Sequence, residues 1–125
     1  MSRTQMFLVV SALVWLPYGL FCLANPDFLR GGAGIAIESS TGRTEVRAMY
    51  GGLQAALGVF VILGLVDRRR ERGVLHVLAV LCGGLFSARL VGVLADGGVS
   101  SYTASALVFE GGSTFAALAL LRGRR

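Results

Sequence analysis

Four long apolar segments restrict what this chain can fold into. Each is about 20 residues long, which is the length an α-helix needs to cross the hydrocarbon core of a bilayer. A helix also pairs all its backbone polar groups internally, as a lipid environment requires. The sequence therefore predicts an all-α fold, an integral membrane four-helix bundle that forms one transmembrane domain over residues 1–125. The predicted helices are residues 6–24, 45–66, 73–95 and 102–121.

The composition agrees with a membrane protein and argues against a nucleic-acid partner. Hydrophobic residues make up 54% of the chain and charged residues only 15%, too few to coat a soluble domain of this size. The formal net charge is +5, but the arginines cluster at the ends of the apolar segments. Such clusters are topology signals and contacts for anionic lipid. Membrane lipid is the expected partner, and no nucleic acid is expected because no polar, aromatic-rich platform accompanies the charge.

The positions of the arginines predict the orientation in the membrane. The connection at residues 67–72 and the tail at residues 122–125 hold most of the positive charge, which places both on the cytoplasmic side. An even number of spans then puts the N-terminus inside as well, in agreement with Arg3. This N-in/C-in arrangement leaves a long outer connection between the first and second helices. A signal peptide ending near Ala24 is the alternative for the first segment, although it would have only Arg3 as its charged region.

The outer connection at residues 25–44 is too apolar for a free loop. Asn25 and Pro26 end the first helix because proline cannot continue it. Thr44 is the expected N-cap of the second helix, with Glu45 in the first turn, where the helix dipole favours an anion. The connection is either a tether between two helices or a lid over a pocket.

A polar stripe runs along the start of the second segment. At helical spacing, four residues that cannot face lipid comfortably fall on one side of the helix. We therefore expect this side to face other helices or a wet pocket. The residues are Arg47, Gly51, Gln54 and Gly58.

Glycines inside the apolar segments predict close helix packing. In the third segment Gly84, Ala88 and Gly92 form a ridge of small residues, which is typical of a contact between helices. Glycine faces of this kind also make a homo-oligomer a possible partner state.

The sequence offers no ligand set for a metal or a metal-containing cofactor. It has a single histidine and two cysteines, Cys22 and Cys82, which the topology separates by too much depth for a disulfide. We expect no metal and no cofactor.

Two charged residues lie inside apolar segments and are predicted to pair. Arg89 lies about six residues before the outer end of the third helix, near 9 Å deep at a rise of 1.5 Å per residue. Glu110 lies about eight residues into the fourth helix, near 12 Å deep by the same rise. The short connection at residues 96–101 makes these helices antiparallel neighbours. An unpaired charge at the bilayer centre costs about 2.5–3.5 kcal/mol, so pairing is expected.

These charges and their polar neighbours form the candidate site. One interpretation is that they only fix the register of the bundle. The other is a small polar pocket, open outward or laterally to lipid, in which the arginines hold an anionic or carbonyl group and Glu110 is the candidate catalytic acid or base. The predicted ligand-binding residues are Glu45, Arg47, Tyr50, Gln54, Arg89 and Glu110.

Four stretches of the chain resemble a family. They are LPYGLFCLANPDFL, TEVRAMYGGLQAALG, ARLVGVLADGG and LVFEGG, and they are similar to the small bacterial membrane proteins of the domain-of-unknown-function 4345 family. The most specific part is E-x-R-x-x-Y-G-G, which begins at Glu45 and ends at Gly52. The resemblance covers nearly the whole chain. It implies four spans, a shared polar cluster and a bacterial cytoplasmic (inner) membrane, but no known activity.

Three function classes follow from these observations. The leading hypothesis is a binding or accessory protein whose polar cluster, in the outer half of the membrane, takes a small or lipid-like ligand. The second is an enzyme acting on a lipid-soluble substrate, with Glu110 as acid or base. The third is a small oligomeric transporter or channel.

Overall fold

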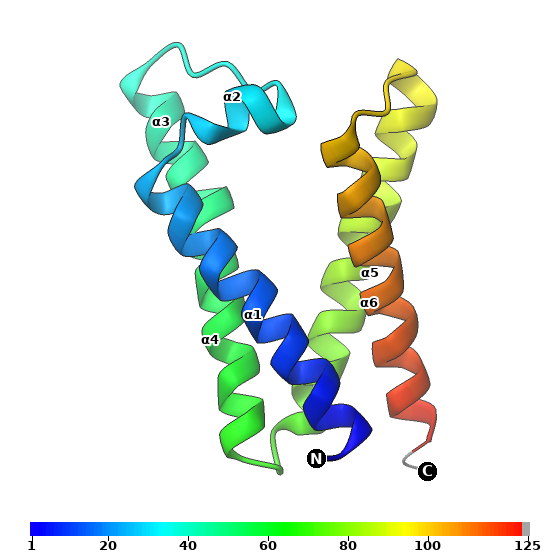
Figure 1. Cartoon of the computed structure of the whole chain (residues 1–125). Coiled ribbons are helices and arrows are strands. Elements are labelled where there is room, and N and C mark those ends of the chain that lie inside the picture. The colour runs from blue at the N-terminus through cyan, green and yellow to red at the C-terminus, as the bar shows by residue number, and fades with distance from the viewer. Residues whose placement is uncertain (124–125) are drawn as a thin grey trace. The chain divides into compact units, whose positions relative to one another are not determined.

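The computed structural model describes residues 1–123, and every regular element in that range is a helix. This confirms the all-helical prediction. Figure 1 shows the elements in chain order. They are α1 (Arg3–Ala24), α2 (Phe28–Ala33), α3 (Ser40–Val46), the π-helical turn η1 (Arg47–Gly52), α4 (Leu53–Val66), α5 (Glu71–Asp96) and α6 (Ser101–Arg122).

Four of the helices are long and apolar enough to cross a membrane. α1 and α6 each have 22 residues, α5 has 26, and α3, η1 and α4 continue one another over the 27 residues of Ser40–Val66. At 1.5 Å per residue even the shortest is about 33 Å long, more than the hydrocarbon core of about 30 Å. The chain is therefore a multi-pass membrane protein. Of the predicted cytoplasmic tail, Arg124 and Arg125 lie outside the described residues.

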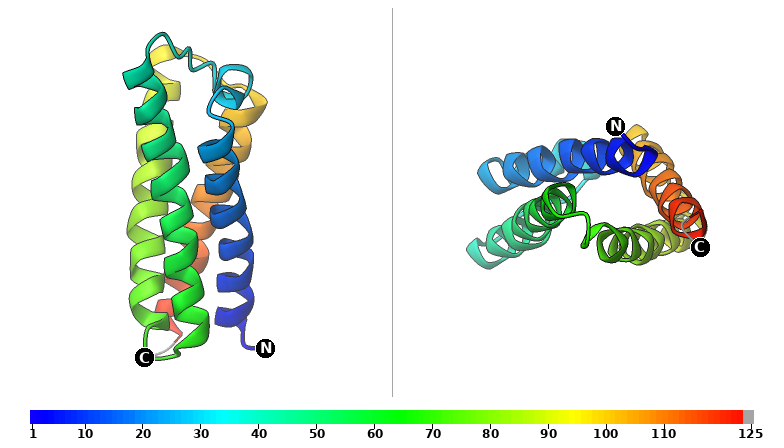
Figure 2. Two further views of the ribbon diagram at one scale, coloured as in Figure 1. Left: turned by 90° about the vertical axis from the view of Figure 1, so that its left-hand side faces the viewer. Right: turned by 90° about the horizontal axis from the view of Figure 1, so that it is seen from below.

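The helices form two compact units, Met1–Arg68 and Arg69–Arg125. In the first unit α1 lies antiparallel to the helix made by α3, η1 and α4, and in the second α5 lies antiparallel to α6. The side and end views in Figure 2 show the same two pairings. The assignment of the whole chain to one transmembrane domain stays a prediction.

The first helix begins three residues earlier than predicted, at Arg3 instead of Met6, because a capping box starts it. The Ser2 hydroxyl accepts a hydrogen bond from the Gln5 backbone N–H at 3.2 Å, and the Gln5 side chain accepts one from the Ser2 backbone N–H at 3.0 Å. The helix ends at Asn25, before Pro26.

The second membrane helix begins at Ser40, so the prediction that Thr44 caps it was wrong. The cap is Ser39, whose hydroxyl accepts a hydrogen bond from the Gly42 backbone N–H at 3.0 Å. Thr44 lies within the helix, where its hydroxyl donates to the Ser40 carbonyl at 3.1 Å. Serine and threonine both favour N-caps, and here the earlier of the available hydroxyl residues takes the role.

A π-helical turn interrupts the second membrane helix at η1, which the sequence analysis did not predict. The N–H of Leu53 donates to the carbonyl of Ala48, five residues back, instead of the usual four. The turn contains Arg47, Tyr50, Gly51 and Gly52. Such turns occur frequently at functional sites, and this one holds the motif E-x-R-x-x-Y-G-G from Arg47 onward, whereas Glu45 lies in α3.

The predicted polar stripe faces α1. A Cβ built on Gly51 would lie 2.8 Å from the Leu23 Cα, and one built on Gly58 would lie 2.5 Å from the Leu16 backbone nitrogen. On the α1 side, a Cβ at Gly19 would collide with the Ala55 backbone. The two backbones therefore touch at three glycines, which confirms the expectation that this side of the helix faces another helix.

The contact between α5 and α6 does not use the ridge predicted from Gly84, Ala88 and Gly92. A Cβ at Gly84 or Gly92 would meet no atom within 4 Å among the described residues, and Ala88 is exposed. It is Gly83 that faces α6, where its Cβ would lie 3.4 Å from the Thr114 Cγ2. The contact is thus one residue away from the predicted ridge, a rotation of about 100° around the helix.

Candidate functional site

Arg89 and Glu110 form a bidentate ion pair between α5 and α6. The Arg89 Nε donates to the Glu110 Oε2 at 3.0 Å, and the Arg89 Nη2 donates to Oε1 at 2.8 Å. Two parallel charge-assisted bonds are the strongest and most directional form of this contact. The pairing predicted from the depth of the two residues is confirmed.

The tight connection between the helices brings the two charges to the same level. Gly97 ends α5 in the left-handed conformation at φ 75°, which a residue without a side chain adopts without strain. The Ser100 hydroxyl then caps α6 by accepting from the Thr103 backbone N–H at 3.1 Å. A short turn of this kind makes the helices antiparallel neighbours, so residues at equal distances from it face each other.

The two partners differ in how much of their side chains is exposed. The Glu110 carboxylate is enclosed, with 5% of the side chain exposed, whereas 27% of the Arg89 side chain is exposed. The pair therefore combines a partly exposed arginine side chain with a buried carboxylate. Its charges cancel, which makes the arrangement tolerable within an apolar segment.

Further polar groups adjoin the pair on the same two helices. The Thr114 hydroxyl donates to the Glu110 backbone carbonyl at 2.8 Å. Cys82 and Ser113 are buried and hydrogen-bond to each other through their side chains, with Cys82 near enough to Glu110 to feel its charge. Cys82 was not among the site residues predicted from the sequence. The sequence could have indicated that Cys82 lies near the pair, because Cys82 comes two helical turns before Arg89 on the same face of α5.

Arg47 lies near the start of the second membrane helix, in the unit Met1–Arg68, and binds a backbone carbonyl. Its Nε donates to the Leu23 carbonyl at 3.2 Å, in the last turn of α1. Glu45 is exposed, and within residues 1–123 it makes no hydrogen bond or ion pair. Arg47 is therefore directed toward α1 and forms no ion pair with Glu45.

Tyr50 and Gln54 follow Arg47 along the same helix and are half-buried. Tyr50 is part of η1, and Gln54 lies in the first turn of α4. With Glu45 and Arg47 they belong to the unit Met1–Arg68, whereas Arg89 and Glu110 belong to Arg69–Arg125. The union of all six residues in one cluster stays a prediction.

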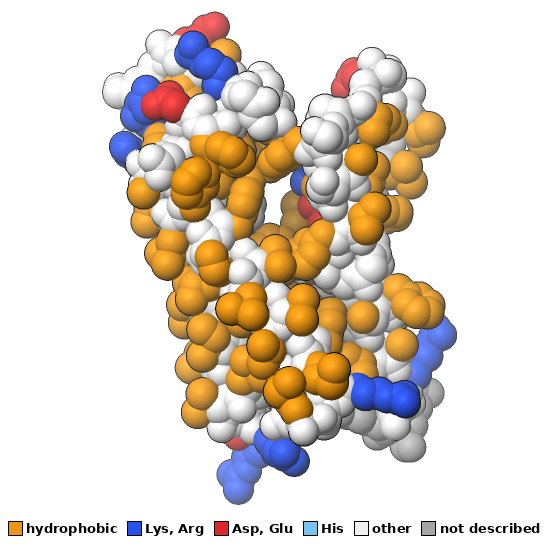
Figure 3. Space-filling view, viewed as in Figure 1, with side chains coloured by type: hydrophobic (Ala, Val, Ile, Leu, Met, Phe, Trp, Pro, Cys, Tyr) orange, Lys and Arg blue, Asp and Glu red, His pale blue; other side chains and the backbone are white. Residues whose placement is uncertain are grey.

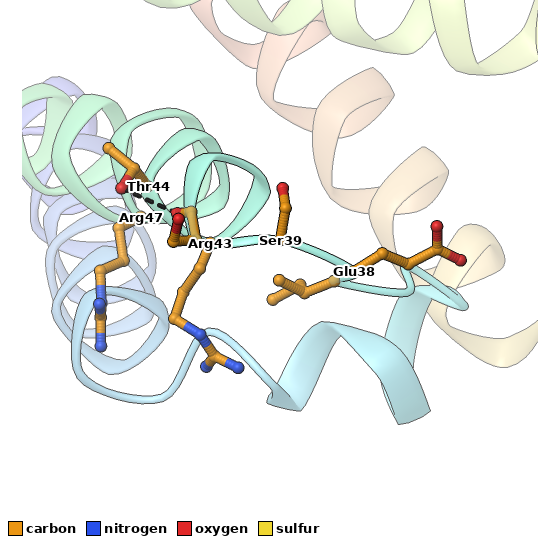
Figure 4. Close-up of a pocket in the computed structure, with 7 residues that line it drawn as sticks. Glu38, Ser39, Arg43, Thr44 and Arg47 are labelled. Carbon is orange, nitrogen blue, oxygen red and sulfur yellow. Dashed lines mark hydrogen bonds between the residues drawn. The ribbon is translucent and has the colours of Figure 1, made fainter.

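An open hollow of about 480 Å³ lies where the second membrane helix begins, beside the connection that precedes it (Figure 4). At its edge the Arg43 Nη1 contacts the Asp27 Oδ2 at 2.6 Å. This hydrogen bond from Arg43 lowers the pKa of the Asp27 carboxyl below its ordinary value. The sequence analysis named neither residue. The hollow is lined by Ile37, Glu38, Ser39, Ser40, Arg43, Thr44 and Arg47.

In residues 1–123 no group of three or more His, Cys, Asp or Glu side chains is placed to hold a metal ion. Cys22 and Cys82 are both free thiols.

Comparison with known families connects this geometry to a family. A family described as a domain of unknown function, DUF4345, matches residues 3–121. The chain belongs to the DUF4345 family. The match includes both the E-x-R-x-x-Y-G-G motif at η1 and the Arg89–Glu110 pair, so the resemblance noted in the sequence is confirmed. A search of curated proteins and of solved structures found no match to this DUF4345 chain.

Proposed function

We propose that this DUF4345 protein binds a small or lipid-like molecule at the Arg89–Glu110 pair, as a binding or accessory protein of a bacterial cytoplasmic membrane. The observation that supports the proposal is the bidentate pair itself, which lies within helices apolar enough to cross a membrane. Ionisable residues inside membrane spans are rare and mark functional sites by default.

The charge balance of the pair indicates the chemistry of the ligand. Glu110 already neutralises Arg89, so a second anion at this site would have to compete with a buried carboxylate. A neutral molecule with a carbonyl oxygen can lie against the partly exposed Arg89 side chain without adding a charge that disturbs that balance. We therefore expect a lipid-soluble carbonyl compound in preference to a free anion.

The same geometry favours binding over acid–base catalysis. Both oxygens of Glu110 accept hydrogen bonds from Arg89, so neither is directed at a substrate proton in this arrangement. A general base must come within hydrogen-bond reach of the proton it removes. Catalysis by Glu110, and transport through an oligomer, stay alternatives.

The topology that goes with this proposal has both chain termini in the cytoplasm. The arginines of the connection between α4 and α5, among them Arg68, Arg69, Arg70 and Arg72, support it. Reporter fusions at the C-terminus and within residues 97–100 test the topology independently of any ligand.

Native mass spectrometry of the gently purified protein tests the binding proposal. We expect a stoichiometric small molecule on the wild type, lost from a folded Glu110→Gln variant because the amide cannot hold Arg89 in the same bidentate geometry. The matched control is Asp96→Asn, the corresponding carboxylate-to-amide substitution at an exposed position, which should keep the molecule. Bare wild-type protein, or a molecule that stays on Glu110→Gln, would contradict the proposal. The same spectra report whether the protein is a homo-oligomer.

A further inference from the structure

The hollow at the start of the second membrane helix is a second place where this protein offers positive charge to a ligand. It lies within the unit Met1–Arg68 and shares no residue with the Arg89–Glu110 pair. Its volume of about 480 Å³ falls within the range of small-ligand sites, about 300–1,000 Å³.

Two arginines of the hollow point the same way. Arg43 and Arg47 lie one turn apart on the same helix, a spacing that places both side chains on one face. Figure 4 shows their guanidinium groups directed to the same side, while the carboxylate of Glu38 points away from them. The two cations of the hollow are thus near each other, and its one carboxylate is turned elsewhere.

Within residues 1–123 both guanidinium groups keep N–H donors that make no hydrogen bond. Arg47 engages only its Nε, with the Leu23 carbonyl, and Arg43 engages only Nη1, with Asp27. Paired guanidinium groups with open N–H donors fit the oxygens of a phosphate, which accept such bonds in a planar, bidentate manner.

Charges of both signs surround the hollow, but few of them are paired. The Asp27 carboxylate lies within electrostatic reach of three arginines, Arg30, Arg43 and Arg47. The carboxylates of Glu38 and Glu45 are exposed, and within residues 1–123 only Asp27 forms an ion pair with one of these arginines. On the face shown in Figure 3, charged side chains gather over α2 and α3, and hydrophobic side chains cover α1 below them.

The location of the hollow indicates where that anion comes from. The hollow lies at the beginning of a membrane-length helix. An exposed aromatic pair, Phe21 and Phe28, lies at the end of α1 and the start of α2, with ring centroids 5.0 Å apart. Aromatic residues and arginines at helix ends are typical of the level where lipid headgroups lie.

We propose that this hollow binds the phosphate of an anionic phospholipid headgroup, with Arg43 and Arg47 as its two guanidinium ligands. Asp27 occupies Arg43 when the site is empty and competes with the phosphate for it. The site is therefore selective for lipids with net negative charge, since a zwitterionic headgroup brings its own cation toward the arginines.

Titration of the full-length protein in detergent with phosphatidylglycerol, followed by native mass spectrometry, tests this inference. Arg47→Gln should weaken phosphatidylglycerol binding about tenfold through loss of charge-assisted hydrogen bonds. The matched control is Arg3→Gln, an exposed arginine outside the arginine clusters, at the opposite end of α1 from Leu23, which should change binding less than twofold. Equal losses in the two variants, or equal binding of phosphatidylethanolamine by the wild type, would overturn the proposal.

The Asp27–Arg43 contact separates a binding role from a structural one. If the site binds phosphate, Arg43→Gln weakens phosphatidylglycerol binding whereas Asp27→Asn strengthens it, because the competing carboxylate is gone. If the contact only holds the connection in place, both substitutions weaken binding alike, and this result refutes the proposal. The comparison does not depend on whether Arg47→Gln folds. Displacement of the lipid by millimolar inorganic phosphate would assign the site to free phosphate and overturn the choice of a lipid.

Discussion

The two helix pairs of this protein are held together by different contacts. In the first unit α1 meets η1 and α4 at glycines, where the backbones touch and almost no side chain intervenes. In the second unit α5 and α6 meet through side chains, among them the Arg89–Glu110 ion pair and the contact of Gly83 with Thr114.

The difference shows two ways to associate helices that lie in lipid. Lipid tails are as apolar as leucine, so burial of apolar surface does not drive the helices together. Close backbone packing supplies van der Waals contact in the first unit, and a charge-assisted hydrogen bond supplies attraction in the second. The glycine contact depends on shape, so an added side-chain atom disrupts it. The ion pair depends on charge, so removal of either partner disrupts it.

Breaking the ion pair should have the largest effect. Arg89→Ala leaves the Glu110 carboxylate buried without its partner, and we expect it to lower the free energy of unfolding by about 3 kcal/mol or more. Thermal or denaturant unfolding in detergent measures this loss.

The double variant Arg89→Leu/Glu110→Leu is the control for that prediction. Replacement of both charges by apolar groups leaves no buried charge behind and should recover most of the stability. A double variant as unstable as Arg89→Ala would show that the pair stabilises the fold through its shape and not through charge pairing.

Filling a glycine contact should have the next largest effect. In Gly58→Ala the added methyl group meets the Leu16 backbone, so the helices must separate, which costs about 1–3 kcal/mol of unfolding free energy. The matched control is Gly84→Ala, whose methyl group meets no atom within 4 Å; it should be neutral or stabilise the helix by up to about 1 kcal/mol. Equal effects of the two substitutions would contradict the glycine contact.

The exposed Asp27–Arg43 pair should have the smallest effect, and one that depends on pH. The pKa of Asp27 is lowered in the folded protein from an ordinary value of 3.8, mainly by its hydrogen bond from Arg43. The folded state therefore holds this proton more weakly than the unfolded state, and the pair stabilises above pH 3.8. That stabilisation is lost as the pH falls through the folded-state pKa.

Melting temperatures of the wild type and Asp27→Asn at several pH values measure this difference. The wild type should be slightly more stable near neutral pH and equal to the variant once Asp27 is protonated. A difference that stays constant at all pH values would exclude the ion pair as its cause. Comparison of this loss of stability with that of Arg89→Ala then shows how much more it costs to break a buried ion pair than an exposed one.

The sequence predicted the features that depend on spacing along a single helix. The four membrane helices, the pairing of Arg89 with Glu110 and the helix-facing side of Gly51 and Gly58 all follow from length, depth and periodicity. The beginning of the second membrane helix was harder, because Ser39 and Thr44 are both good caps and only the folded backbone selects between them.

Contacts between separate segments were decided by the tertiary structure. The π-helical turn at η1 changes the helical phase by one residue, and α5 uses Gly83 instead of Gly84 against α6. The contact of Asp27 with Arg43 joins residues 16 positions apart across an irregular connection. Periodicity determines which residues share a helix face, but the rotation of that face toward a partner depends on how two surfaces fit together, and this fit is a property of the folded chain.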